Sequence, residues 1–259
     1  MTELSFTGQE FEILWAAYDR DRLPYPLQFQ PEATDFDDLK RQREAAVESL
    51  FGKYSTDLTR ALEVLLDPEA RVESKGFSGP ELARTYRFHG AVHGEEGATL
   101  TQDDAGDVIL RRCTASEVAK SAMRILPPTQ AGTHPPIEVR REEVATDRAR
   151  HVRPAYELSL TQQLNRIFQR DRLGLGEITV YAGPAVDARP AFGRGFWWMD
   201  YEDGRYYVQT GDPIIAKPMD AAVMAAELDR LLALTQRFNR EDRDHDEYLR
   251  RRAPRGSNL

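Results

Sequence analysis

The sequence predicts an α+β fold with antiparallel strands, in a pattern of helix, strands and closing helix that occurs twice in 259 residues. Apolar residues recur at helical spacing up to residue 66, and short alternating runs broken by turn residues follow up to residue 113. The same order returns between residues 156 and 238. The two parts share little sequence identity, so whether the repeat reflects true internal symmetry stays open at this point.

Three helices are expected before the first strands. The first follows the N-cap residue Thr7, the second begins at Thr34 or Asp35 and ends at Gly52, and the third spans Thr56–Leu66. Between the first two helices, the sequence LPYPL is an extended connector, because each proline lacks an amide donor. The strands expected next have the sequences ARVESKGF, RTYRFHGAVHG, ATLTQ and DVILRRC, and a helix containing EVAKSAMRIL follows them.

The second part begins after a stretch rich in proline and charge. A helix after residue 156 leads to the strands GEITVYAG, GFWWMDY and RYYVQT, and a long helix spans Met219–Phe238. The charged stretch of residues 138–153 is expected to be a solvated helix or a mobile loop. The predicted organisation is an N-terminal half (1–126), a linker (127–155), a C-terminal half (156–238) and a charged C-terminal tail (239–259) that frays into disorder.

Composition disfavours several classes of partner. A formal net charge of −8 and a pI of about 5.3 repel nucleic acid and anionic membranes. The single cysteine, Cys113, excludes an intramolecular disulfide and suits a reducing compartment. Neither a signal peptide nor a run of about 20 apolar residues is visible. We therefore expect a soluble, cytoplasmic protein without nucleic acid or membrane partners.

Aromatic residues crowd into the segment Phe192–Asp212, FGRGFWWMDYEDGRYYVQTGD. Asp203-Gly204 predicts a hairpin turn there, and strand alternation places Phe196 and Trp198 on one face and Trp197 on the other. A central strand pair with both faces covered is one interpretation. The alternative is that one face forms a docking patch for another protein. A base-stacking platform would need interleaved basic residues, and here only Arg194 and Arg205 flank the strand pair.

Candidate catalytic and ligand-binding motifs are weak. His89 and His93 are four residues apart on a predicted strand, so they lie about 13 Å apart, too far to share a zinc ion. Gly174-x-Gly176 precedes a strand rather than a helix, and Gly52-Lys53 lacks the glycines of a phosphate loop. No catalytic residue, metal or cofactor is therefore predicted, and the residues alone indicate a binding protein of unknown partner.

Four segments, in order along the chain, resemble the EspG family, the cytosolic chaperones of ESX (type VII) secretion in mycobacteria and related actinobacteria. They are LPYPL (23–27), LTRALEVLLDPEARVES (58–74), RPAFGRGFWWMDYEDGRYYVQTGD (189–212) and AAVMAAELDRLLAL (221–234). The aromatic density of the third segment and the basic C-terminal extension depart from the family pattern. The resemblance implies a central, mostly antiparallel sheet, flanking helices and two quasi-equivalent halves.

The resemblance also implies a function without catalysis, namely one-to-one binding of PPE proteins, as PE–PPE heterodimers, at the tip of the PPE helical hairpin. A PPE-like or WXG-type hairpin is an alternative cargo. The partner-binding residues implied are Phe196, Trp197, Trp198 and Met199 on the sheet, together with a mobile loop at Gly94, Glu95, Glu96 and Gly97, or at Ser78–Pro80.

Two other classes of function stay open. A small-molecule enzyme would have a cleft between the two halves, with Arg194, Asp200 and Tyr206 as polar groups. A self-associating structural or regulatory module would pair the aromatic face with its own copy, so that the free protein is a homodimer.

Overall fold

The computed structural model describes residues 3–149, 158–185 and 192–252. Within these ranges ten strands form one sheet with the order β1-β5-β4-β3-β2-β7-β8-β9-β10-β6. Each neighbouring pair of strands is antiparallel. The predicted α+β fold with a central antiparallel sheet is confirmed.

The elements alternate along the chain as follows. The strands are β1 (Glu3–Phe6), β2 (Ala70–Ser78), β3 (Arg84–His93), β4 (Glu96–Gln102), β5 (Val108–Thr114), β6 (Ile137–Val139), β7 (Gly174–Ala182), β8 (Arg194–Tyr201), β9 (Gly204–Gln209) and β10 (Ile214–Pro218). The α-helices are α1 (Gly8–Ala16), α2 (Phe36–Lys53), α3 (Thr56–Leu66), α4 (Ala115–Arg124), α5 (Arg141–Ala149), α6 (Leu160–Phe168) and α7 (Ala221–Arg252), and a short 3₁₀ helix, η1 (Pro80–Leu82), joins β2 to β3.

The two predicted halves are quasi-equivalent. Each has the order helix, four strands, helix: α3 and β2–β5 lead to α4, and α6 and β7–β10 lead to α7. The halves meet where β2 pairs with β7, with Gly76 opposite Gly176. A Cβ atom on Gly176 would lie 2.6 Å from the Cα of Gly76, so the pairing of β2 with β7 needs glycine at position 176. The linker limits at residues 127 and 155 stay a prediction, and residues 150–155 lie outside the described ranges.

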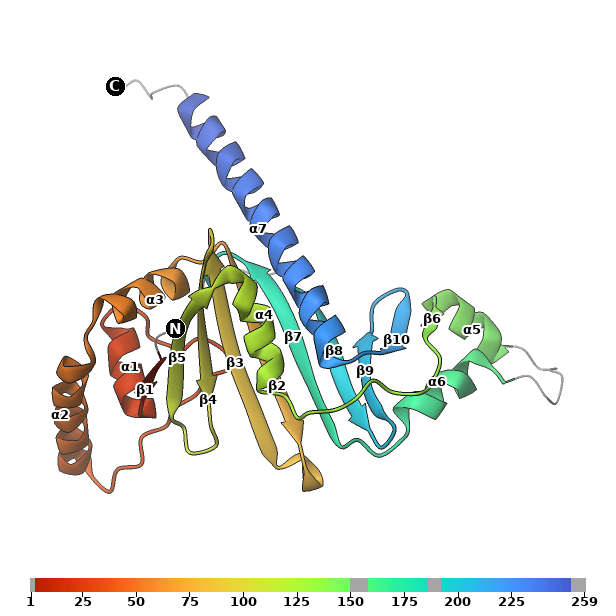
Figure 1. Ribbon diagram of the computed structural model, residues 1–259, viewed down its shortest axis with the longest axis horizontal. Helices are drawn as coiled ribbons and strands as arrows, with labels where there is room; N and C mark the ends of the chain where they lie inside the picture. The colour runs from red at the N-terminus through yellow and green to blue at the C-terminus, as the bar shows by residue number, and fades with distance from the viewer. Residues whose placement is uncertain (1–2, 150–157, 186–191, 253–259) are drawn as a thin grey trace.

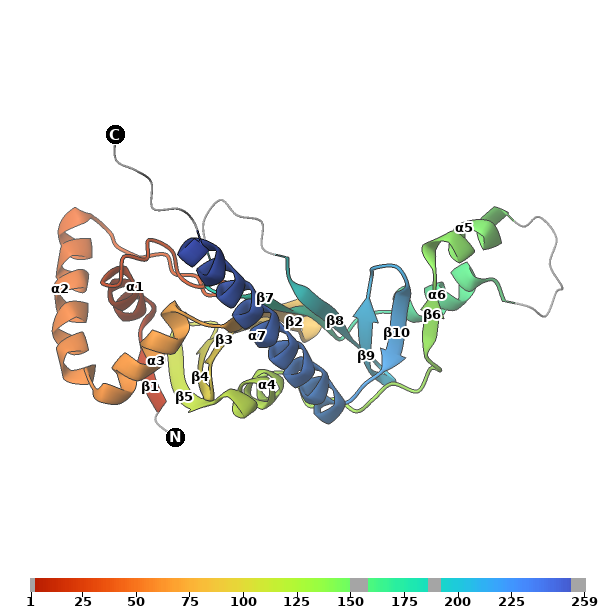
Figure 2. The same cartoon turned by 90° about the horizontal axis from the view of Figure 1, so that it is seen from above.

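Helices cover the sheet unequally. On one face, α4 and α7 pack side by side over the middle strands, and their apolar residues share one core with β2, β3, β7 and β8 (Figure 1). On the opposite face, α1–α3 form a second core at the N-terminal end of the sheet, and α5 and α6 a third core at the other end (Figure 2). The middle of this second face therefore lies between two groups of helices.

Three short strands were absent from the sequence prediction. β1 pairs with β5, and β6 pairs with β10 at the far edge of the sheet. These strands have three to five residues each, too few for alternation to be visible in the sequence. The charged stretch expected to be a solvated helix or loop thus begins with β6 and continues as α5.

Two helix ends also differ from the prediction. Gly52 was expected to end the second helix, but α2 includes it and ends at Lys53. The expected C-terminal tail from residue 239 is helical, because α7 continues to Arg252. Ion pairs one turn apart, Arg237 with Glu241 and Arg251 with Glu247, favour this extension. Residues 253–259 lie outside the described ranges, so their expected disorder stays a prediction.

Candidate functional site

The candidate site is the middle of the sheet on the face opposite α4 and α7, formed by β2, β7 and β8. Strand register builds it in rows. Phe77 lies opposite Leu175, which lies opposite Met199, and all three side chains are half-buried. Cross-strand neighbours in such rows have Cβ atoms about 5 Å apart, so the three form a continuous apolar row. We call this surface, together with Trp197 in the next row, the open sheet face.

Trp197 is the most exposed aromatic residue of this surface. It is 36% exposed, and its cross-strand neighbour is Glu177, with Lys75 next in the same row beyond Glu177. A hollow of about 230 Å³ lies beside Trp197, and Gly195 and Thr179 are among the residues that line it. A large aromatic ring next to a hollow, with charged groups at its edge, can accept an apolar side chain from a partner.

Phe196 and Trp198, which were predicted to contact a partner, are buried instead. Both belong to the core beneath α4 and α7. The indole of Trp198 fills space left by glycine, since a Cβ on Gly76 would lie 2.4 Å from its Cζ2 atom. Alternation correctly places Trp197 on the other face, but the sequence could not say which face the helices cover. The accessible part of the predicted sheet site is therefore Trp197 and Met199.

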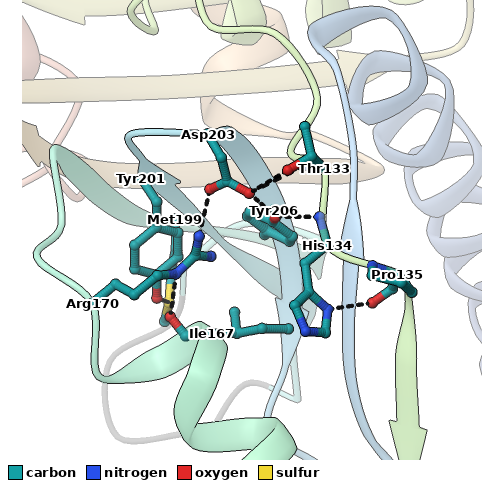
Figure 3. Close-up of polar contacts among 9 residues, drawn as sticks. All are labelled: Thr133, His134, Pro135, Ile167, Arg170, Met199, Tyr201, Asp203 and Tyr206. Carbon is teal, nitrogen blue, oxygen red and sulfur yellow. Dashed lines mark hydrogen bonds and ion pairs between the residues drawn. The ribbon is translucent and has the colours of Figure 1, made fainter.

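A polar network fixes the hairpin that carries Trp197 (Figure 3). The carboxylate of Asp203, in the β8–β9 turn, accepts hydrogen bonds from the amide and hydroxyl of Thr133 at 3.2 and 3.1 Å. It also accepts hydrogen bonds from the hydroxyl of Tyr206 and from Nη1 of Arg170 at 2.6 Å. The hydroxyl of Tyr206 in turn accepts a bond from the amide of His134 at 2.8 Å. The network ties the segment after α4, and the segment after α6, to this hairpin.

Asp203 stays ionised in this network. Burial alone would raise the pKa of Asp203, but the hydrogen bonds from Tyr206, Thr133 and Arg170 lower it to about 2. The guanidinium of Arg170 also lies 4.2 Å from the ring centroid of Tyr201, a cation–π contact. These contacts hold the end of β8 in one position, so Trp197 is presented on a rigid strand.

The turn Gly94–Gly97, predicted as a mobile partner-binding loop, is a tight β3–β4 turn tied to α7. The amide of Gly94 donates to Oε2 of Glu69 at 3.0 Å, and its carbonyl accepts a bond from Gln236 at 3.2 Å. Gly97 is buried, whereas Glu95 and Glu96 are exposed. This turn lies about six residues along β3 from the row of Trp197, a distance of roughly 20 Å.

The alternative loop, Ser78–Pro80, borders the open sheet face directly. It follows Phe77 at the end of β2 and leads into η1. Gly79 has a φ of 80°, and Glu81 and Leu82 have φ values of 54° and 58°, which is unusual for residues with side chains. Strained backbone of this kind clusters at ligand-binding segments. The structure therefore places the two predicted loops at opposite ends of β3, with Ser78–Pro80 next to Trp197's face.

The residues of the predicted enzyme cleft do not converge. Asp200 is buried and pairs with Arg205, whose Nε and Nη2 lie 2.6 and 2.7 Å from its carboxylate oxygens. Tyr206 lies opposite Met199 across the strands, so its side chain points to the other face of the sheet from Asp200 and joins the network of Figure 3. Arg194 lies over the ring of Phe238 on α7 at 5.0 Å. The three polar groups thus belong to three separate structural contacts.

His89 and His93 also have separate structural partners. Nδ1 of His89 lies 2.8 Å from the carbonyl oxygen of Tyr25, and burial lowers the pKa of His89 to about 4. Nδ1 of His93 lies 2.7 Å from the carbonyl oxygen of Asp67. Burial raises the pKa of the Cys113 thiol to about 11, so little reactive thiolate forms near neutral pH.

Neither a metal-binding cluster nor a membrane-spanning helix occurs among the described residues. Among these residues no group of three His, Cys, Asp or Glu side chains is arranged to hold a metal ion. None of the helices in the described ranges combines the length and apolar character needed to span a membrane.

Two residues of the open sheet face, Phe77 and Leu175, were missing from the predicted site. Phe77 is near the end of β2 and Leu175 is near the start of β7, and alternation places Phe77 on the same face of the sheet as Lys75. Their contribution depends on the β2–β7 pairing, which joins residues about 100 positions apart. The basic loop at residues 189–191, part of the segment used for the family resemblance, lies outside the described ranges.

Comparison with known proteins identifies relatives by sequence and by fold. The EspG family matches residues 7–230 of the chain. No curated protein matches by sequence. Among solved structures, the chain is similar to the Mycobacterium tuberculosis type VII secretion system chaperone EspG5, determined in complex with a PE25–PPE41 dimer. The TM-score is 0.61 at 14% identity, over 90% of this chain and 96% of that chain, which shows a shared fold.

Proposed function

The chain belongs to the EspG family, and from this premise we propose that it is a chaperone of type VII secretion that binds the helical hairpin of a PPE-type protein. The cargo would be a PE–PPE heterodimer, or a WXG-type hairpin in its place. Binding covers apolar residues at the tip of the cargo until secretion, without nucleotide hydrolysis. The fold shared with EspG5, which was determined with a PE–PPE dimer, supports this proposal.

The observation that carries the proposal is the exposed Trp197 on an otherwise well-packed sheet. Binding energy in protein interfaces concentrates in a few aromatic and apolar anchors surrounded by polar groups. Trp197 has this setting, with the row of Phe77, Leu175 and Met199 on one side and the hollow on the other. A standard interface buries about 800 Å² on each partner, an area that extends past these four residues.

The surroundings of the open sheet face supply the rest of the interface. Ser78–Pro80 and η1 border it at one end, and Lys75 and Glu177 give it a charged edge. The turn Gly94–Gly97 stays a second proposed contact through its exposed residues, Glu95 and Glu96. A partner that reaches both turns must span most of the length of β3.

We also propose that the protein has no catalytic activity and works in the cytoplasm. The two carboxylates whose pKa values are lowered to about 2, Asp203 and Glu69, are each enclosed in hydrogen bonds from side chains of this chain. Their shifts thus have structural causes, and neither group faces the open sheet face with a free acceptor.

The test is co-expression with a PE–PPE pair encoded in the same genome, followed by affinity measurement on the purified proteins. The wild-type chain should form a soluble one-to-one complex with the heterodimer. Trp197→Ala should weaken binding by at least about tenfold, since interface tryptophans are typical hot spots. The matched control is Phe36→Ala, which removes an exposed aromatic ring from α2, at the far end of the molecule (Figure 1).

The control should bind as tightly as the wild type. If neither the wild type nor the control binds any of the cargo pairs, the proposed function is wrong. If all three proteins bind equally well, the function holds but the open sheet face is not the site.

A further inference from the structure

Helix α2 carries a second exposed apolar surface, at the end of the molecule away from β8 (Figures 1 and 2). Its inner side, with Ala46 and Leu50, is buried, and α2 packs against α1. Its outer side exposes Phe36 (78%) and Phe51 (74%), with Val47 between them. A groove of about 500 Å³ runs along this outer side.

The residues along the groove recur at a spacing typical of helix pairing. Phe36, Lys40, Arg43, Val47 and Phe51 follow one another at intervals of four, three, four and four residues. Such intervals align side chains in one stripe on a helix, as in a coiled coil. The stripe is 16 residues long from end to end, which corresponds to about 23 Å.

The basic and acidic halves of the groove are complementary to those of a second copy laid antiparallel, most directly at its centre. Basic Lys40 and Arg43 occupy its first half, and acidic Glu44 and Glu48 its second half. A two-fold axis placed between residues 43 and 44 brings Arg43 opposite Glu44 of a second copy, and Phe36 opposite that copy's Phe51. A parallel pairing would instead set each charge against the same charge, which is unfavourable.

We propose that α2 is a self-association surface, on which two copies of this chain pair their α2 helices antiparallel about a two-fold axis. The contact is isologous, so each copy supplies both a basic and an acidic half. Its occupant is a second copy because reversing the stripe brings its acidic half against the basic half of the first copy and its phenylalanines against each other.

The charged groups that face this surface are free to change partners. Within one chain, Lys40 lies 3.9 Å from Glu44, and Nη1 of Arg43 lies 3.5 Å from a carboxylate oxygen of Glu12 on α1. Both are long, solvent-exposed pairs, which contribute little to stability. A standard interface buries about 1,600 Å² of accessible surface, and one pair of helices buries less. The dimer is therefore weak and forms at high protein concentration.

This surface is independent of the proposed cargo site, because α2 and β8 lie in different parts of the molecule. The α2 contact also differs from pairing through the aromatic face of the sheet. In that arrangement Trp197 would be covered in the dimer, whereas pairing through α2 leaves it exposed.

Sedimentation velocity of the full chain tests the proposal over a range from about 1 μM to about 1 mM. The wild type should pass from monomer to dimer within this range. Arg43→Glu and Glu44→Arg should each weaken dimerisation about tenfold or more, since each sets like charges opposite one another twice. Both positions are exposed, so circular dichroism and thermal midpoints should match the wild type.

Charge exchange gives the decisive comparison. An equimolar mixture of the two single variants should form a heterodimer, and the double variant R43E/E44R should dimerise as the wild type does. A wild type that stays monomeric throughout would overturn the proposal. A dimer that is weakened by Trp197→Ala but not by Arg43→Glu would also overturn it and would locate the contact on the sheet. Cargo binding by Arg43→Glu should equal that of the wild type.

Discussion

Glu69 should stabilise the fold through α7 in a pH-dependent way. Its carboxylate accepts hydrogen bonds from Nε and Nη2 of Arg240 at 2.8 and 2.6 Å, from the amide of Gly94 at 3.0 Å and from Gln236 at 3.1 Å. Arg240 contributes most to lowering the pKa of Glu69, from 4.5 to about 2. Glu69→Gln removes the charge and one of the two acceptor oxygens, so the four donors cannot all be satisfied.

The magnitude follows from linkage between protonation and folding. A pKa lowered from 4.5 to about 2 corresponds to about 3 kcal/mol, at about 1.4 kcal/mol per pH unit. Because the Arg240 side chain is 53% exposed, water screens its attraction to Glu69. We therefore expect the interaction to contribute only about 1–2 kcal/mol to the free energy of unfolding at pH 7. The folded-state pKa lies below the unfolded value, so the stabilisation is complete above pH 4.5 and is lost as pH falls towards 2.

Urea unfolding of the wild type and Glu69→Gln, followed by circular dichroism at pH 7 and at pH 3, measures this effect. The variant should lose about 1–2 kcal/mol at pH 7 and less than half as much at pH 3. The control, Glu95→Gln, changes an exposed carboxylate of the neighbouring turn and should stay within about 0.5 kcal/mol of the wild type. An equal loss for Glu69→Gln at both pH values would refute the electrostatic account.

Three other changes test the packing and the polar network. Gly76→Ala should cost about 1–3 kcal/mol in urea unfolding because its Cβ would lie 2.4 Å from Trp198, whereas Gly52→Ala, with no described atom within 4 Å, should be neutral or stabilising by up to about 1 kcal/mol. Asp203→Asn should cost about 1–3 kcal/mol at pH 7, and calorimetry should show this loss shrinking as pH falls from 3.8 towards 2, since the unfolded wild-type chain then takes up a proton at Asp203 while the folded protein still holds it ionised. Cys113 should react slowly with Ellman's reagent in the folded protein and rapidly in urea; fast reaction of the folded protein would contradict its burial.

Local sequence signals predicted the long elements well. Helical spacing marked α1–α4, and alternation with turn residues marked β2–β5 and β7–β9. The short strands β1, β6 and β10 lacked such a signal, because three to five residues are too few to show alternation, and the edge strands β1 and β6 pair only with segments distant in sequence. The extension of α7 past residue 238 was missed because its residues are charged on all sides, a pattern that also fits a disordered tail.

The candidate site could be predicted only in part, for a similar reason. Alternation separated Trp197 from Trp198, but the exposure of each depends on where α4 and α7 pack. The contribution of Phe77 and Leu175 depends on the junction between the halves, at Gly76 and Gly176. Contacts between distant segments decide both points, and periodicity within one segment carries no information about them.

Photo-crosslinking from position 197 tests the central claim most directly. A benzophenone amino acid replaces Trp197 in one variant and Phe36 in another, and each is irradiated with a PE–PPE pair that the wild type binds. The account predicts covalent attachment of the PPE hairpin to position 197 and none to position 36. Attachment to position 36 alone would show that cargo binds somewhere other than the open sheet face.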